Sequence, residues 1–342
     1  MEEHYNVGPD RPVFWEAIRS ALGLPSVWLF LVFAFAFPPL ALTFGWFGWI
    51  GDTIGQRYEA GSLIGNLDAI FRHDHADGLN SLATSTSNAV SILGLVYVLA
   101  GILRAGGWLQ IFLERRQDRP LRRFFFGGGR YFFRFFRLWL LVGGLVALLS
   151  WSLSDLPWKE LVDKGLLGLA DGDLEELESE WTVVRREWAQ AGAAFVLFGL
   201  ILVWAIYART RMAVLDSGSA LTAGLMALLM ILRHPLRTLR PFLLVFLVEF
   251  AFVLLAGWVA SKINTGLGPD SSWIPIVCLC CLSLLTLAVR EVLQGARYSA
   301  AVQVVTQVVR KPSRPDARSL GGPGGPRYPI DSDEADAYGV SL

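Results

Sequence analysis

The chain has 342 residues, 54% of them hydrophobic, and carries no net charge at pH 7. That length could hold two soluble domains, but 13 Trp and 22 Phe in so apolar a chain favour one body embedded in lipid. A neutral chain lacks the overall basic charge that favours nucleic acids or other polyanions, so no nucleic-acid partner is expected.

The N-terminal segment, residues 1–26, is polar and precedes an uncharged run at 27–50. No small-residue cleavage pattern follows that run, so it is predicted to be a retained span and not a signal peptide. The segment before it is expected to be a cytoplasmic N-terminus with a helix at the membrane interface. Pro38 and Pro39, near the middle of the run, remove two backbone donors, which predicts a kink and carbonyls that a neighbouring helix must satisfy.

Apolar runs long enough to cross about 30 Å of hydrocarbon recur along the chain. They predict an all-α integral membrane protein with six transmembrane helices, at about 27–50, 84–103, 138–154, 189–208, 241–261 and 273–293. These spans make up a membrane domain that covers residues 27–311. Residues 312–342 are rich in Pro and Gly and end acidic, which predicts a disordered cytoplasmic tail.

Charged residues predict the orientation of the spans. Residues 104–140 and 209–240 are rich in Arg, whereas residues 155–187 are acidic. Because positively charged loops stay in the cytoplasm, both termini are expected inside and the acidic loops outside. The preference for Arg over Lys is typical of a GC-rich bacterial genome, so the membrane is expected to be the bacterial inner membrane. Tryptophans then mark the outer ends of the spans, as an aromatic belt would: Trp46, Trp49, Trp151, Trp188, Trp258 and Trp273.

An arginine pattern occurs twice in the chain. Arg130, Arg134 and Arg137 precede one apolar run, and Arg233, Arg237 and Arg240 precede another with the same spacing. Positions i, i+4 and i+7 share one helical face, so each copy predicts a helix that lies in the membrane surface and continues into a span. The six arginines are expected to contact lipid headgroups, anionic ones on the cytoplasmic side.

The arginine pattern extends to a threefold repeat. A degenerate first copy begins at Arg19, and the pairs Leu103-Arg104, Ala208-Arg209 and Ala296-Arg297 each follow an even-numbered span. The predicted architecture is therefore three repeats of an interfacial helix plus a helical hairpin, whose neighbouring units bury a shared face. Parallel repeats are one route to a transporter, but they are also a simple way to build a helix bundle.

Glu249 is the ionisable residue that lies deepest in an otherwise apolar span. At 1.5 Å per residue it is about 12 Å beyond Pro241, and Arg290 on the next span is about 10 Å before Arg297. The matching depths predict an ion pair between Glu249 and Arg290, because an unpaired carboxylate in hydrocarbon is costly. Two alternatives stay open. Glu249 is protonated and bonds a backbone carbonyl, or Arg290 extends to the interface beside Glu291.

The first outer loop contains ligand types that bind metals. His73, His75 and Asp77 could hold Zn²⁺ or a similar ion, although their spacing fits no recognised zinc pattern and a turn at Asp77-Gly78 is ordinary loop chemistry. The three cysteines, at 278, 280 and 281, are interpreted as small apolar side chains within the sixth span. No cofactor is expected.

The three glycines at 127–129 lie just before the first arginine triplet. No Gly-Lys-Ser/Thr follows them, so they do not form a phosphate-binding loop. They are interpreted as a hinge at the start of the surface helix.

One stretch resembles a known group of proteins. Tyr207-Ala-Arg-Thr-Arg211-Met-Ala-Val-Leu, followed by Ser219-Ala and Arg233-His-Pro-Leu-Arg237-Thr-Leu, resembles the inner connection of poorly characterised six-span bacterial membrane proteins. That group is similar to the membrane domain attached to some glycerophosphodiester phosphodiesterases. The resemblance covers residues 195–260 and elsewhere only the topology. It implies a six-helix fold and a membrane location, and it transfers no active-site residue.

The sequence favours a non-catalytic role. No nucleophile elbow, His-Glu-x-x-His motif or pair of outer catalytic carboxylates is present, so no enzyme is expected. The chain is interpreted as a structural or accessory component of the bacterial inner membrane, with the protein partner unknown. The alternative is a transporter or lipid-handling protein with a polar site near Glu249.

Overall fold

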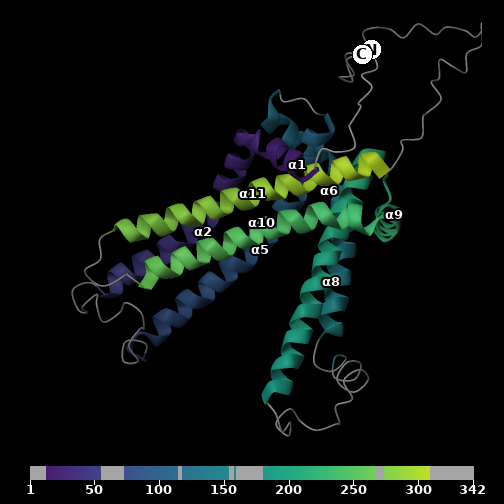
Figure 1. The fold of residues 1–342 in the computed structure, drawn as a ribbon. Coiled ribbons are helices and arrows are strands. Elements are labelled where there is room, and N and C mark those ends of the chain that lie inside the picture. Colours follow the sequence, from purple (N-terminus) through teal and green to yellow (C-terminus); the bar gives the residue numbers. More distant parts are fainter. Residues whose placement is uncertain are drawn as a thin grey trace, which may run out of the picture. The chain divides into compact units, whose positions relative to one another are not determined.

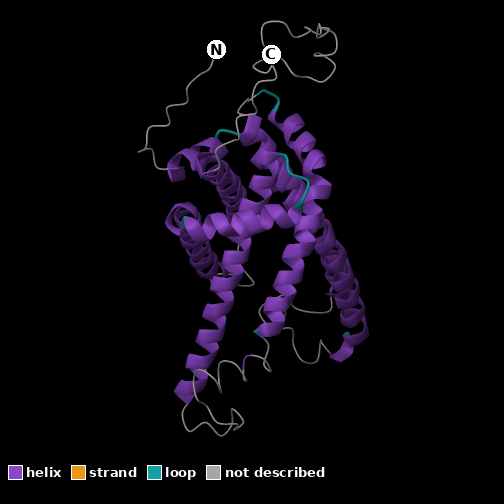
Figure 2. Cartoon of the chain, turned by 90° about the vertical axis from the view of Figure 1, so that its right-hand side faces the viewer, coloured by secondary structure: helices purple, strands orange, loops and turns teal. Residues whose placement is uncertain are grey.

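The chain folds into α-helices, as the apolar runs predict. The computed structural model describes residues 13–54, 73–114, 118–153, 158, 180–265 and 273–308, and in this part of the chain Figure 2 shows only helices and loops. The helices are α1 (Val13–Leu22), α2 (Pro25–Ile54), α5 (Ala76–Glu114), α6 (Pro120–Ser152), α8 (Glu180–Leu215), α9 (Ala220–Arg233), α10 (Pro235–Thr265) and α11 (Ile274–Val308) (Figure 1).

Six of these helices are long and apolar enough to cross a membrane: α2, α5, α6, α8, α10 and α11. The predicted all-α fold with six membrane helices is confirmed, and the chain is a multi-pass membrane protein. The predicted N-terminal segment is described only from Val13 onward, where α1 begins. The predicted tail at 312–342 lies outside the described residues.

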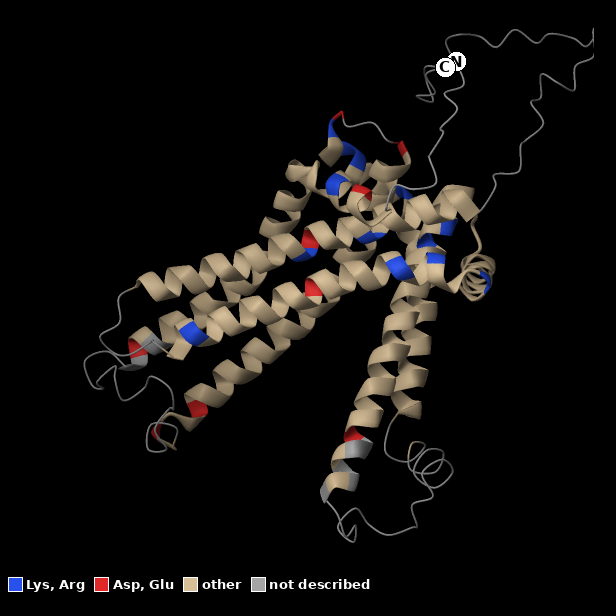
Figure 3. Cartoon of the chain, viewed as in Figure 1, with Lys and Arg blue, Asp and Glu red and all other residues tan. Residues whose placement is uncertain are grey.

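The helices extend beyond the predicted spans on the side that carries the arginines. The span expected at 84–103 continues as α5 to Glu114, and the one expected at 273–293 continues as α11 to Val308. We call this side the arginine-rich end. It comprises α1, α9, the C-terminal parts of α5, α8 and α11, and the N-terminal parts of α6 and α10. Figure 3 shows Lys and Arg concentrated there.

The protein core lies at the arginine-rich end. Its largest fully buried side chains include Trp108 of α5, Phe135 of α6, Tyr207 of α8 and Tyr298 of α11. Toward the other end, the same helices expose Leu, Val, Phe and Trp side chains, as helices surrounded by lipid do. Packing between protein side chains therefore concentrates at one end of the spans.

Glycines bring α5 and α6 into backbone contact. A Cβ atom added at Gly127 would lie 2.7 Å from the carbonyl oxygen of Gly106 and 2.2 Å from the Cβ of Gln110. Only glycine permits so close an approach of two helices. The predicted hinge at 127–129 is therefore wrong, because these glycines lie inside the continuous helix α6 and two of them, Gly127 and Gly128, are buried against α5.

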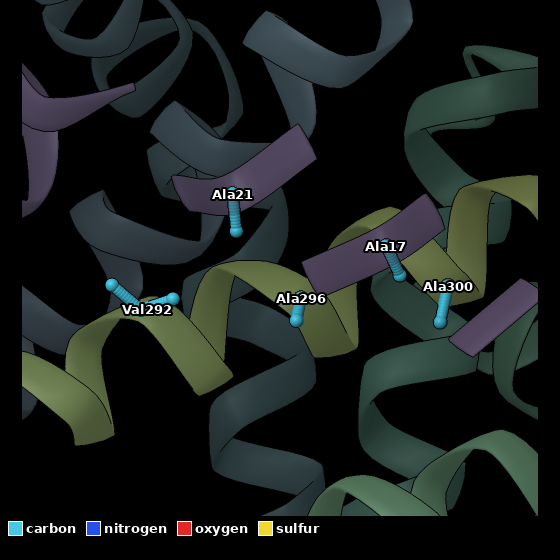
Figure 4. Packing of buried hydrophobic residues seen from close by; sticks show 5 residues of the cluster. All are labelled: Ala17, Ala21, Val292, Ala296 and Ala300. Atoms are coloured by element: carbon cyan, nitrogen blue, oxygen red, sulfur yellow. The ribbon is translucent and has the colours of Figure 1, made fainter. Parts of the chain in front are cut away.

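Small residues also let α1 pack closely against α11. Figure 4 shows Ala17 and Ala21 of α1 facing Val292, Ala296 and Ala300 of α11, all of them buried. The hydroxyl groups of Ser20 and Ser299 lie 2.8 Å apart and form a hydrogen bond across the same contact. The helix predicted at the N-terminal membrane interface is thus packed on α11 along its length.

The two arginine triplets lie in different settings. Arg130, Arg134 and Arg137 share one face of α6, as predicted. The prediction of a shared face is wrong for the second triplet. Arg233 is the last residue of α9, whereas Arg237 and Arg240 lie in α10. The two helices are separate because α9 ends before His234, the residue that precedes Pro235. The equivalence of the three repeat units stays a prediction.

Candidate functional site

The acid predicted to lie deepest in a span contacts two arginines of α11. Arg297 donates from Nη2 to Oε2 of Glu249, and the Nε of Arg290 lies 3.6 Å from Oε1. The structure thus brings the predicted Glu249–Arg290 pair within ion-pair range, but at 3.6 Å this contact is too long for a good hydrogen bond. Arg297 is the main partner. The Glu249 side chain is 16% exposed, whereas that of Arg290 is 71% exposed.

A second ion pair joins α5 to α11. Nη1 of Arg104 donates to Oε1 of Glu291 over 2.6 Å, and its guanidinium carbon lies 5.1 Å from the ring centre of Phe35 on α2. Glu291 is buried, and its Oε2 has no hydrogen-bond partner within the described residues. Adjacent residues thus face different helices, because Glu291 points to α5 while Arg290 reaches α10. The alternative in which Arg290 extends to the interface beside Glu291 stays open, because 71% of the Arg290 side chain is exposed.

A third arginine reaches α11 from α8. Nη1 of Arg209 donates to the hydroxyl of Tyr298 over 3.1 Å, and Tyr298 itself is buried. Arg104, Arg209 and Arg297 are the residues that follow the even-numbered spans in the sequence pattern. The structure places all three at α11, between Glu291 and Tyr298. The pattern singled out these positions, but their convergence depends on how the helices pack.

Glu249, Glu291, Arg104, Arg290 and Arg297 form a charge cluster that ties α5, α10 and α11 together. With three arginines and two glutamates, the charge cluster carries one positive charge in excess. Buried ion pairs hold helices in one relative position, because separating them leaves charges without compensation. Within the charge cluster, Arg290 has the guanidinium group most open to a ligand.

The arginines expected at the membrane interface divide into two groups. Arg134 and Arg130 contact the carboxylate of Asp216, Arg130 at 3.9 Å, and the hydrogen bond from Arg134 holds the pKa of Asp216 below its ordinary value. Asp216 follows α8 in the left-handed conformation, with φ 51°. The other four arginines are exposed: Arg137, Arg233, Arg237 and Arg240. Their contact with lipid headgroups stays a prediction.

The histidine segment is not arranged as a metal site. Among the residues that the structure describes, no three His, Cys, Asp or Glu side chains are grouped to hold an ion. His73 and Asp77 are exposed, and the ring of His75 packs edge-on against Trp49 with 6.4 Å between the ring centres. The three cysteines are exposed along α11.

Comparison of the chain with protein-family models, with curated proteins and with solved structures found no match. The resemblance to six-span bacterial membrane proteins therefore rests on the residues quoted above.

Proposed function

We propose that the chain is a non-catalytic structural or accessory component of the bacterial inner membrane. The observation that supports this role is the pairing of Glu249 and Glu291 with arginines of the same chain. Acids within spans either pair or line a path for ions and protons. Here the carboxylates join α5, α10 and α11, which favours a structural use of their charge.

The exposed arginines support attachment to the cytoplasmic leaflet. Arg137, Arg233, Arg237 and Arg240 lie at the arginine-rich end, where each arginine near an anionic surface contributes about 1 kcal/mol to membrane binding. With both termini cytoplasmic, this end faces the anionic headgroups. The resemblance to membrane domains of glycerophosphodiester phosphodiesterases fits a membrane module that supports other proteins and does no chemistry itself.

The role of Glu249 can be tested in a strain that lacks the gene. The double variant Glu249→Gln/Arg297→Gln replaces the ion pair with neutral side chains that can still hydrogen-bond each other. If the charges are structural, this variant complements the defect of the deletion strain as well as the wild-type chain does, at equal amounts of protein in the membrane. Failure of the double variant to complement the deletion at an equal protein level would overturn the proposal, because Glu249 would then act chemically.

A lipid-handling role is the second candidate, and the exposure of Arg290 favours it. A guanidinium that is 71% exposed within a span can bind a lipid phosphate. Native mass spectrometry of the protein released from nanodiscs of native membrane would detect a retained lipid. This role predicts that Arg290→Gln loses the lipid whereas Arg240→Gln, an interfacial arginine outside the charge cluster, retains it. Equal lipid retention by both variants would reject it.

A further inference from the structure

The helix α9 exposes a row of leucines on one side and buries small residues on the other. At 100° per residue, the leucines fall within an arc of about 100°. They form what we call the leucine face, and all are exposed: Leu221, Leu225, Leu228, Leu229 and Leu232. The buried side includes Ala223, Gly224 and Ala227. It packs on α8, where the indole nitrogen of Trp204 donates a hydrogen bond of 2.8 Å to the carbonyl of Gly224.

The helix α9 runs across α8 and not along it. Trp204 contacts Gly224 near the start of α9. One turn further along α8, the hydroxyl of Tyr207 donates a hydrogen bond of 2.8 Å to the carbonyl of Thr238, which lies beyond the end of α9. Trp204 and Tyr207 are about 4.5 Å apart along the axis of α8, whereas α9 is about 21 Å long. Figure 1 agrees, because it shows α9 end-on and α8 from the side. A helix that crosses a membrane span in this way runs along the plane of the membrane.

The crossing lies where the apolar part of α8 gives way to its arginines. Trp204 is about 3 Å beyond Leu202, which is exposed on α8 as lipid-facing residues are, and about 8 Å before Arg209. At about 21 Å, α9 is itself too short to cross about 30 Å of hydrocarbon. The level of α9 is therefore that at which acyl chains meet headgroups.

The surroundings of the leucine face indicate lipid as its occupant. The apolar surface continues onto α10 at Leu236 and Leu243, both exposed on a membrane helix. Between Asp216 and Glu249 the chain has no acidic residue. Three exposed arginines follow the leucine face: Arg233, Arg237 and Arg240. Exposed leucines beside arginines, with no acid among them, are typical of a helix that lies in an anionic membrane surface.

The two edges of the leucine face differ in polarity. Thr222 and Arg233 lie together at one edge, whereas Leu228 lies at the other, about 120° from Thr222. The polar edge fits the headgroups, and the Leu228 edge fits the acyl chains. We propose that α9 is an anchor in the cytoplasmic leaflet, with the leucine face among acyl chains and the three arginines on the phosphates of anionic lipids. This inference rests on the proposed attachment of the arginine-rich end to that leaflet and adds the segment that enters it.

Quenching by brominated lipids measures the depth of each edge. The background replaces Cys278, Cys280 and Cys281 with Ala, because all three are exposed. Single cysteines at Leu228 or Thr222 then carry a bimane label in nanodiscs. An interfacial helix buries its apolar face by about 5–10 Å, so lipids brominated in the middle of the acyl chain should quench the Leu228 label at least about twofold more. Thr222 is the matched control, since it is exposed on the same helix.

A second measurement tests the arginines. In nanodiscs that mix phosphatidylglycerol with phosphatidylcholine, only one of the two lipids carries bromine. The Leu228 label should be quenched at least about twofold more by the brominated phosphatidylglycerol, which is anionic. The triple variant Arg233→Gln/Arg237→Gln/Arg240→Gln should lose this preference. The control Arg122→Gln, which changes an exposed arginine of α6, should keep it. A thermal melt of each labelled protein confirms that it is folded.

Two results would overturn the anchor. The first is quenching of the Leu228 label no stronger than that of the Thr222 label, which would assign the leucine face to water or to a protein partner. The second is equal quenching by the two lipids, which would remove the arginines from the site. Complementation by Glu249→Gln/Arg297→Gln without quenching at Leu228 would overturn the anchor alone. Quenching without complementation would keep the anchor and overturn only the structural role.

Discussion

Tyr97 of α5 donates a hydrogen bond of 2.8 Å to the carbonyl of Phe35 on α2, the carbonyl that Pro39 leaves without its helical donor. Removing the hydroxyl with Tyr97→Phe should lower the free energy of unfolding by about 1 kcal/mol, because the carbonyl then stays unsatisfied. An SDS titration that follows tryptophan fluorescence measures the change.

A double-mutant cycle isolates this contact. Pro39→Ala restores a backbone N–H that can bond the carbonyl of Phe35. In that background, Tyr97→Phe should cost less than half as much as in the wild-type chain. An undiminished cost would show that Tyr97 stabilises the helix pair through its ring alone, which packs on Phe35.

The contact between α5 and α6 predicts opposite effects for two neighbouring glycines. Gly127→Ala should lower the free energy of unfolding by about 2 kcal/mol or more, because the new Cβ would meet the carbonyl oxygen of Gly106 at 2.7 Å. Gly129→Ala is the matched control, since its Cβ would have no atom within 4 Å. Alanine there should stabilise the helix by about 0.5 kcal/mol. Thermal melts in detergent distinguish these outcomes, and similar melts for both variants would refute the backbone contact.

The buried pair at Arg104 and Glu291 should matter more than an exposed one. Arg104→Ala leaves the buried carboxylate of Glu291 without its partner and should cost about 3 kcal/mol. The double variant Arg104→Met/Glu291→Met should recover most of this loss, because an apolar pair needs no compensation. The control is Arg123→Ala, which breaks a 3.3 Å pair with the exposed Glu114 and should cost under about 1 kcal/mol. The measurement is the same SDS titration, and a double variant as unstable as Arg104→Ala would contradict the pairing.

Acidification should weaken the contact between Asp216 and α6. The pKa of Asp216 is lowered by its hydrogen bond from Arg134, so the stabilisation is present above the ordinary carboxyl pKa and disappears as the pH falls through the lowered value. Asp216→Asn keeps a residue that tolerates the left-handed conformation but removes the charge. The wild-type chain should melt above this variant at pH 7, and the difference should disappear as the pH falls through the lowered pKa of Asp216. Two results would show that the contact does not depend on charge. One is a difference in melting temperature between the two proteins that persists in acid, and the other is a difference at pH 7 that 1 M salt leaves unchanged.

The orientation of the chain can be tested with reporter fusions. A reporter placed after Asp171 should behave as extracytoplasmic, and one placed after Leu342 as cytoplasmic, because arginine-rich segments stay inside. Both positions lie outside the described residues, so the fusions need not interrupt a described helix. The reverse activity at either site would reject the topology.

The sequence predicts what depends on single helices. Uncharged runs indicate the six membrane helices, and Pro39 indicates a carbonyl in need of a donor, because both follow from local chemistry. The continuation of the helices α5 and α11 beyond their apolar runs could not be predicted from local sequence in the same way. Those ends, such as Gly106 and Ala300, are buried by packing between small residues and not by hydrophobic length.

Contacts within the charge cluster depend on how helices rotate and cross. Equal depth predicted Arg290 as the partner of Glu249, but a long arginine side chain bridges backbone positions at different depths. Arg297 therefore reaches the same carboxylate, although its position suggested only the edge of the membrane. The pair between Arg104 and Glu291 joins residues 187 positions apart in the chain, and no local pattern reports such a contact.

The position of α11 in the chain has a consequence for biosynthesis. Every helix that α11 contacts precedes it and leaves the ribosome first. Until α11 is inserted, Arg104, Arg209 and Glu249 have none of the α11 partners that they contact in the finished fold. A nascent chain that stops before Ile274 therefore lacks the groups on α11 that pair with Arg104 and Glu249 in the finished fold. Insertion of α11 is therefore the step of biosynthesis at which these side chains acquire their partners.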